Sequence, residues 1–226
     1  MTKIDSPPRR RNALIPVFGA LAAIAAAAVL YETARPAGKV ASDCPADSAK
    51  LAATLAPLAK GELAALSVAA DPRRPEQFAF QREDGGKVTL ADFRGRAVLL
   101  NLWATWCVPC RAEMPALDRL QAEKGGKGFE VVAVNVDTAR LERRAAFLDG
   151  IGVKTLARYA DPSGDAFETL RRDGKALGLP VTLVIDKDGC EVGAVEGGVK
   201  WDSAEAQALV GALKGGTHPN EQGKSG

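Results

Sequence analysis

Trp106-Cys107-Val108-Pro109-Cys110 is the stretch that decides how this chain of 226 residues folds, because two thiols separated by two residues can close a ring and open it again. Before it, residues 97–103 form a run of branched apolar side chains, which predicts a strand buried on both faces. After it, apolar residues recur at helical spacing over 111–122, and Gly125-Gly126 is the expected end of the helix. The stretch is therefore expected to lie between a buried strand and a helix.

This order of strand, turn, cysteines and helix gives the two thiols different expected roles. Cys107 lies at the helix N-terminus, where unpaired N–H groups and the helix dipole stabilise a thiolate, so it is the expected nucleophile. Cys110 lies one turn into the helix, where a shielded thiol is suited to attack a mixed disulfide from within. We therefore interpret the pair as a dithiol/disulfide redox centre.

The composition limits the other functions that this chain can have. With 46% hydrophobic and 26% charged residues it can bury one sizeable core. A net charge of +2, with no basic stripe, argues against nucleic-acid binding. His218 is the single histidine and lies in a polar tail, so no Cys/His catalytic pair is expected. A zinc site is disfavoured because Cys44 and Cys190 are isolated, and we expect neither a metal nor a cofactor.

An uncharged segment near the N-terminus predicts a membrane anchor. Residues 13–31 contain no charge over 19 positions, which is enough for a minimal span, and more cations precede this segment than follow it. By the positive-inside rule, residues 1–12 are then cytoplasmic, 13–31 form a transmembrane signal anchor, 32–43 form a linker, and the remainder is exported. A cleaved signal peptide is the main alternative, and a twin-arginine signal is a weaker one.

The remainder is expected to comprise a helical extension at 44–77, a main domain at 78–214 and a disordered tail at 215–226. Pro57 makes the extension either one helix or two short ones. For the main domain the pattern predicts, in order, a hairpin of 78–81 and 87–90, the strand 97–103, the helix 111–122, a strand at 129–137, a helix at 141–149, a short strand at about 155–159, a helix at 165–173, a hairpin of 181–186 and 190–196, and a helix at 202–214 begun by a capping box of Asp202 and Glu205. Alternating strands and helices indicate a partly parallel sheet.

Several short segments together carry a family resemblance. They are Leu90 to Gly95, Asn101 to Trp106, Arg111 to Leu117, Gly178 to Thr182 and Val184 to Asp186. With the Cys-x-x-Cys motif they resemble the TlpA family of membrane-anchored, exported thiol:disulfide oxidoreductases. The resemblance implies an α/β thioredoxin fold, a central mixed β-sheet flanked by helices, with an N-terminal β-hairpin and helical extension after one transmembrane helix.

The resemblance also assigns roles around the dithiol. Pro180 corresponds to a proline whose peptide bond with the preceding residue, here Leu179, is cis and lies beside the dithiol. Trp106, Val108, Pro109 and Leu179 would complete a groove for the substrate. Asn101 stands where thioredoxins carry a buried Asp, and Asn cannot titrate. Glu113 resembles the acid that related reductases use instead, although a solvated glutamate favoured by the helix dipole is an equally weighted alternative.

Two cysteines lie outside the motif. In an oxidising compartment Cys44 and Cys190 are expected to pair as a structural disulfide, the alternative being two separate buried thiols. Family membership implies a single-pass protein of the inner membrane with its domain in the periplasm. It suggests a reductant of protein disulfides in cytochrome oxidase or cytochrome c biogenesis, with copper chaperones or apoproteins as clients and a membrane electron donor of the DsbD or CcdA type.

Two other functions stay open at this point. The first is a thiol peroxidase of the peroxiredoxin type, but Ala104 occupies the position where that site needs Thr or Ser. The second is a non-catalytic module that binds clients through the Pro180 groove. The direction of electron flow is not encoded legibly, because a few tens of millivolts reverse it.

Overall fold

One eight-stranded sheet organises the part of the chain that the computed structural model describes, residues 44–139 and 142–215. Its strand order is β1-β8-β7-β4-β5-β6-β2-β3. The strands are β1 Leu66–Arg73, β2 Phe80–Gln81, β3 Lys87–Val88, β4 Ala97–Trp103, β5 Phe129–Asn135, β6 Tyr159–Ala160, β7 Val181–Ile185 and β8 Glu191–Glu196. β4 runs parallel to β5 and antiparallel to β7, so the sheet is mixed, as predicted.

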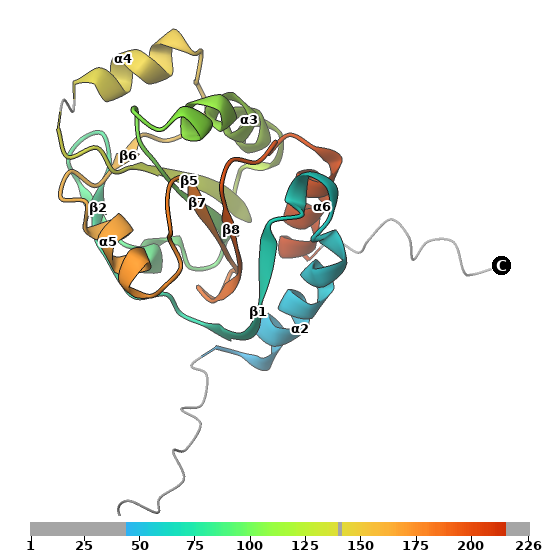
Figure 1. Ribbon diagram of the computed structural model, residues 1–226. Helices are drawn as coiled ribbons and strands as arrows, with labels where there is room; N and C mark the ends of the chain where they lie inside the picture. Colours follow the sequence, from blue (N-terminus) through green and yellow to red (C-terminus); the bar gives the residue numbers. More distant parts are fainter. Residues whose placement is uncertain (1–43, 140–141, 216–226) are drawn as a thin grey trace, which may run out of the picture. The chain divides into compact units, whose positions relative to one another are not determined.

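Five α-helices are present in the described residues (Figure 1). They are α2 Ala46–Leu55, α3 Val108–Lys124, α4 Arg143–Gly150, α5 Asp165–Arg172 and α6 Ala204–Leu213, with short 3₁₀ turns at η1 Ala56–Leu58, η2 Gly61–Leu63 and η3 Leu90–Phe93. α6 packs between α2 and α3, which ties the N-terminal helix to the helix that carries the cysteines.

β4 is the strand that positions the cysteines. All seven of its residues are buried, as expected for a strand covered on both faces, and it ends four residues before Cys107. The helix that follows starts at Val108 and ends at Lys124, directly before the predicted stop at Gly125. The strand, the turn and the helix are therefore confirmed in the predicted order.

Other boundaries differ from the expected ones. The strand predicted at 155–159 is reduced to Tyr159–Ala160. The capping box predicted for the last helix is wrong, because α6 begins at Ala204 and its N-cap is Ser203, whose hydroxyl accepts the Ala206 N–H at 3.2 Å. Asp202 instead accepts a hydrogen bond from Arg119 Nε at 2.9 Å, so it joins α6 to α3.

The N-terminal extension also differs, because it is not helical throughout. After α2 and two 3₁₀ turns, the chain forms strand β1, which pairs antiparallel with β8 in the register Leu66↔Val195 and Ser67↔Ala194. Leu55 and Leu63 are fully buried in the same hydrophobic core as the sheet. The extension is thus continuous with the sheet and its core.

The predicted membrane anchor and the segments on either side of it precede the described part of the chain. The segments 1–12, 13–31 and 32–43 lie outside the described residues, as does the tail after residue 215. Within residues 44–139 and 142–215, none of the helices is both long and apolar enough to cross a lipid bilayer.

Candidate active site

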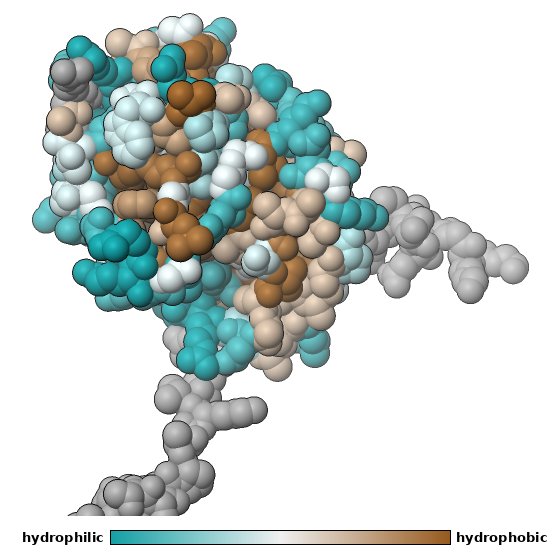
Figure 2. Space-filling view, viewed as in Figure 1, coloured by the Kyte–Doolittle hydropathy of each residue, from teal (hydrophilic) through white to brown (hydrophobic). Residues whose placement is uncertain are grey.

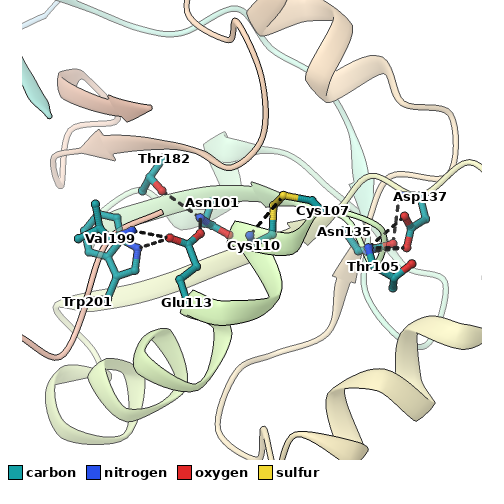
Figure 3. Close-up of a disulfide and its surroundings, with 10 residues drawn as sticks. All are labelled: Asn101, Thr105, Cys107, Cys110, Glu113, Asn135, Asp137, Thr182, Val199 and Trp201. Carbon is teal, nitrogen blue, oxygen red and sulfur yellow. Dashed lines mark hydrogen bonds between the residues drawn. A yellow bond between two sulfur atoms is a disulfide. The ribbon is translucent and has the colours of Figure 1, made fainter. Parts of the chain in front are cut away.

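Cys107 and Cys110 are joined as a disulfide at the start of α3, just after the turn that connects β4 to α3 (Figure 3). Cys107 is the N-cap of α3, and its Sγ accepts the Cys110 N–H at 3.3 Å. Cys110 is 0% exposed, whereas Cys107 retains some contact with solvent. After reduction, the helix N-terminus would stabilise a thiolate on Cys107 more than on the deeper Cys110.

The segment around the dithiol is held at its base and exposed at its tip. Trp106 is 70% exposed and Val108 is 72% exposed, which is unusual for large apolar side chains. The buried carboxylate of Asp137 accepts the Thr105 N–H at 3.2 Å, and Asn135 Nδ2 donates to the same carboxylate at 3.0 Å. Asp137 therefore fixes the turn that presents Trp106 and Cys107.

Asp137 was not predicted as part of the site. The available signal was its position two residues after the end of β5, because the carboxyl ends of parallel strands meet at one edge of a sheet. β5 is the parallel neighbour of β4, so a polar side chain after β5 reaches the turn after β4.

Pro180 lies at the same end of the sheet as the dithiol. The Leu179-Pro180 peptide bond is cis, and the following residue, Val181, is in register with Leu102 near the end of β4. Pro180 is buried, and its carbonyl accepts the Gly197 N–H at 2.9 Å. Leu179 is partly exposed.

Glu113 lies in the interior, 4% exposed, one turn beyond Cys110 on α3. Its Oε1 accepts a hydrogen bond from Asn101 Nδ2 at 2.8 Å. Its Oε2 accepts the Val199 N–H at 3.0 Å and the Trp201 indole N–H at 3.1 Å. The alternative of a solvated glutamate is therefore wrong, because α6 and the loop before it cover this face of α3.

Two opposing effects act on the Glu113 carboxyl. Burial removes water from the charged form and raises the pKa of Glu113 from 4.5 to about 7, while the hydrogen bonds from Val199, Asn101 and Trp201 act in the opposite direction. Desolvation is the larger effect. The result is a carboxyl group that exchanges its proton near neutral pH, within one helical turn of Cys110. Val199 and Trp201 were not predicted as part of the site.

Asn101 completes this buried network. It is 0% exposed, and its Nδ2 donates to Thr182 Oγ1 at 3.0 Å as well as to Glu113. Asn101 Oδ1 has no hydrogen-bond partner among the described residues.

The second disulfide, Cys44–Cys190, lies at the opposite end of the sheet, with a Cα–Cα distance of 6.0 Å. Cys190 is fully buried just before β8, at the end where Ile185 pairs with Val98 near the start of β4. A hydrogen bond of 2.5 Å from Ser48 Oγ to Asp186 holds α2 at the same place. The pairing that we expected is present, so all four cysteines are in disulfides.

Comparisons with known proteins agree with this geometry. A family model described as Redoxin matches residues 68–210, more than half of the chain. Thioredoxin-like protein YneN of Bacillus subtilis is 38% identical over 114 residues, which cover 50% of this chain and 63% of that protein. Thiol-disulfide oxidoreductase ResA of Bacillus thuringiensis is 32% identical over 114 residues, which cover 50% of this chain and 62% of that protein. The alignments thus span less than two thirds of each relative.

Solved structures resemble the chain as well. The crystal structure of a thiol:disulfide interchange protein of the thioredoxin family from Chlorobium tepidum matches with a TM-score of 0.52 and 26% identity. The match covers 63% of this chain and 99% of that protein. The common part is therefore nearly the whole of the Chlorobium tepidum protein.

Proposed function

Because the chain belongs to the Redoxin family and carries a closed Cys-x-x-Cys disulfide at a helix N-terminus, we propose that it is a thiol:disulfide oxidoreductase. The mixed sheet and the match to the Chlorobium tepidum structure confirm the predicted thioredoxin fold. The observation that carries the proposal is the asymmetry of the pair, since Cys107 is the helix N-cap and Cys110 is fully buried.

The reaction begins from the reduced dithiol. The Cys107 thiolate attacks one sulfur of a client disulfide, a bond forms between the two sulfurs, and the first client thiolate leaves. Cys110 then loses its proton and attacks Cys107 Sγ, which releases the second client thiolate and closes the Cys107–Cys110 disulfide. Two electrons pass from the dithiol to the client, and the two client thiolates take up protons.

Glu113 is proposed as the group that accepts the Cys110 proton. Cys110 has no contact with bulk solvent, so its proton needs an internal acceptor before resolution. The Glu113 carboxyl lies one turn away, and its pKa of about 7 lets it take up and release a proton at neutral pH. Because Asn101 cannot titrate, Glu113 is the acid/base group of this network.

The client groove is proposed to consist of Trp106, Val108, Pro109, Leu179 and Pro180. Trp106 and Val108 project from the start of α3, and Leu177, in the loop before Pro180, is 86% exposed. Figure 2 shows apolar surface on this face of the molecule, between the start of α3 and α5. An extended client segment could cover this surface while the backbone of Leu179 pairs with it.

The cellular setting is part of the same proposal. We propose that the chain is anchored in the inner membrane through residues 13–31 and acts in the periplasm, where the Cys44–Cys190 disulfide is stable. Its clients are proposed to be disulfide-containing proteins of cytochrome oxidase or cytochrome c biogenesis, namely copper chaperones or apoproteins. A membrane donor of the DsbD or CcdA type would return electrons to Cys107 and Cys110.

The reaction can be tested by reduction of a protein disulfide, such as those of insulin, with the chemically reduced protein. Wild type should transfer two electrons for each chain, and Cys107→Ser should transfer none. Cys110→Ser should accumulate a mixed disulfide between Cys107 and the client, which mass spectrometry would detect. Equal turnover by Cys107→Ser and wild type would disprove the assignment of the nucleophile, and a client-binding activity that survives both substitutions would indicate a binding module instead.

The direction of electron flow needs a separate measurement. Equilibration of the Cys107–Cys110 pair with glutathione buffers gives its reduction potential, and a value below that of the glutathione pool is expected for a reductant. A potential close to that of strong oxidants would contradict the reductant proposal and leave the exchange chemistry intact.

A further inference from the structure

An unpaired atom in the buried network indicates a further interaction, which rests on the proposed exchange reaction. Asn101 Oδ1 is buried and has no hydrogen-bond partner among the described residues, while the dithiol is oxidised. A buried carbonyl oxygen without a hydrogen-bond donor is destabilising, and such atoms are rare in the interior of folded proteins.

The orientation of the Asn101 amide is fixed by its nitrogen. An ionised Glu113 can only accept hydrogen bonds, so the NH₂ group must face its Oε1. The second N–H is used by Thr182 Oγ1, on the neighbouring strand β7 and in register with Asn101. Both donors are thus occupied, and Oδ1 is turned away from Glu113 and Thr182.

The oxygen is turned toward the part of α3 that holds the resolving cysteine. Cys110 and Glu113 lie one turn apart on the face of α3 that packs on β4, and Asn101 contacts the second of them. Figure 3 shows Asn101 between Glu113 and the disulfide. In the oxidised protein Cys110 Sγ carries no hydrogen, so it cannot donate to this oxygen.

We propose that Asn101 Oδ1 accepts a hydrogen bond from the thiol of Cys110 once the disulfide has been reduced. Reduction creates two new S–H groups in this region, but Cys107, at the helix N-cap, is stabilised as a thiolate and does not donate. Cys110 is buried and keeps its proton, so it becomes the donor that Oδ1 lacks. The amide oxygen is therefore a redox-dependent acceptor that holds Cys110 protonated and in place until Glu113 takes the proton.

The inference can be tested by vibrational spectroscopy. In a Cys107→Ser variant with the Cys44–Cys190 disulfide intact, Cys110 is the single thiol, and its S–H stretching band can be read by Raman or infrared spectroscopy at about pH 8, where Glu113 is ionised. A hydrogen-bonded S–H is expected, with a band lowered in frequency relative to the same thiol in Cys107→Ser/Asn101→Ala. Thr182→Val is the matched control, because it removes a partner of Nδ2 and leaves Oδ1 untouched, so the band should stay lowered.

A free-thiol frequency in the Cys107→Ser variant alone would overturn the inference, and this result needs no change at Asn101. A band that does not move on Asn101→Ala would overturn it as well. Because the measurement involves no client, it gives an answer even if the proposed exchange reaction fails in the insulin assay.

A second readout follows from the redox dependence. The hydrogen bond exists only in the reduced form, so its loss should favour the disulfide. In the full chain, Asn101→Ala is expected to shift the equilibrium constant for dithiol–disulfide exchange with glutathione toward the oxidised form by about 2- to 10-fold. This is the change expected when one hydrogen bond between neutral groups is lost from the reduced form. Thr182→Val should leave this equilibrium unchanged. A shift of Asn101→Ala in the opposite direction, or no shift, would contradict the inference.

Discussion

The replacement Glu113→Gln should change how the stability of the oxidised protein depends on pH. Burial raises the pKa of Glu113 from 4.5 to about 7, whereas in the unfolded chain the side chain is solvated and titrates at its ordinary value. Below the ordinary value both states are protonated, and the folded state has its full stability. As the pH rises toward about 7, the unfolded chain loses the proton that the folded chain keeps, so the free energy of unfolding falls.

The magnitude follows from the two pKa values. They differ by about 2.5, and a pKa difference of one corresponds to about 1.36 kcal/mol. Through this one group, the free energy of unfolding of wild type should therefore fall by about 3 kcal/mol between about pH 4.5 and pH 7. Gln is neutral throughout, so Glu113→Gln should lack this loss. The variant also loses some of the hydrogen bonds from Asn101, Val199 and Trp201, because Gln has only one acceptor oxygen. This loss lowers the free energy of unfolding, but it does not produce the fall between about pH 4.5 and pH 7.

The assay is urea unfolding followed by tryptophan fluorescence at a series of pH values, with both disulfides intact. The quantity to compare is the difference between wild type and Glu113→Gln at each pH. Glu123→Gln, at an exposed position on the same helix, is the control and should run parallel to wild type. If the Glu113→Gln and wild-type profiles run parallel as well, the three hydrogen bonds outweigh desolvation, Glu113 is ionised at neutral pH, and the proposed proton transfer from Cys110 loses its basis.

Three further predictions concern other parts of the molecule. Replacing Cys44 and Cys190 together by Ala should lower the free energy of unfolding by about 2 to 5 kcal/mol in a urea titration, while insulin reduction by the dithiol is retained; loss of activity in the folded variant would show that the two disulfides are not independent. Trp201→Phe keeps an aromatic ring but removes a hydrogen-bond donor to Glu113 Oε2, so the pKa of Glu113 should rise further. The pH-dependent fall in the free energy of unfolding should then extend to higher pH, and a shift to lower pH would be inconsistent with this account. Trp106→Ala should leave stability within about 0.5 kcal/mol because the side chain is 70% exposed, yet it should slow the reduction of insulin more than that of a small uncharged disulfide; equal slowing would argue against a role in client binding.

The sequence predicted the part of the fold that is determined by neighbouring residues. β4 and α3 were predicted nearly to their ends, because the apolar run and the helical spacing are both local patterns. β1 was missed because Leu66–Arg73 shows no regular alternation and is a strand only through its pairing with β8, far along the chain. The N-cap at Ser203 was missed because Asp202 also fits a cap and is instead engaged with Arg119.

The candidate site shows the same division. The cysteine motif comprises five adjacent residues, and the expected roles of its two thiols follow from the strand and the helix that directly flank it. The state of Glu113 could not be decided from the sequence, because its burial depends on Val199 and Trp201, which are 86 and 88 residues away. The orphaned oxygen of Asn101 depends likewise on Thr182, which reaches it only through the pairing of β4 with β7.

The placement of the two disulfides at opposite ends of the sheet determines whether the native pairing would survive repeated cycles of the proposed exchange reaction. Four cysteines allow three pairings, and an enzyme that generates a reactive thiolate at every turnover risks isomerising its own bonds. The length of β4, which is seven residues or about 20 Å at the usual rise per residue, lies between the two disulfides. Cys190 is also buried. Within one chain, Cys107 therefore cannot attack the Cys44–Cys190 bond without large-scale unfolding. The fold itself is a kinetic barrier to disulfide scrambling, and it would preserve the native pairing through successive cycles of the proposed reaction.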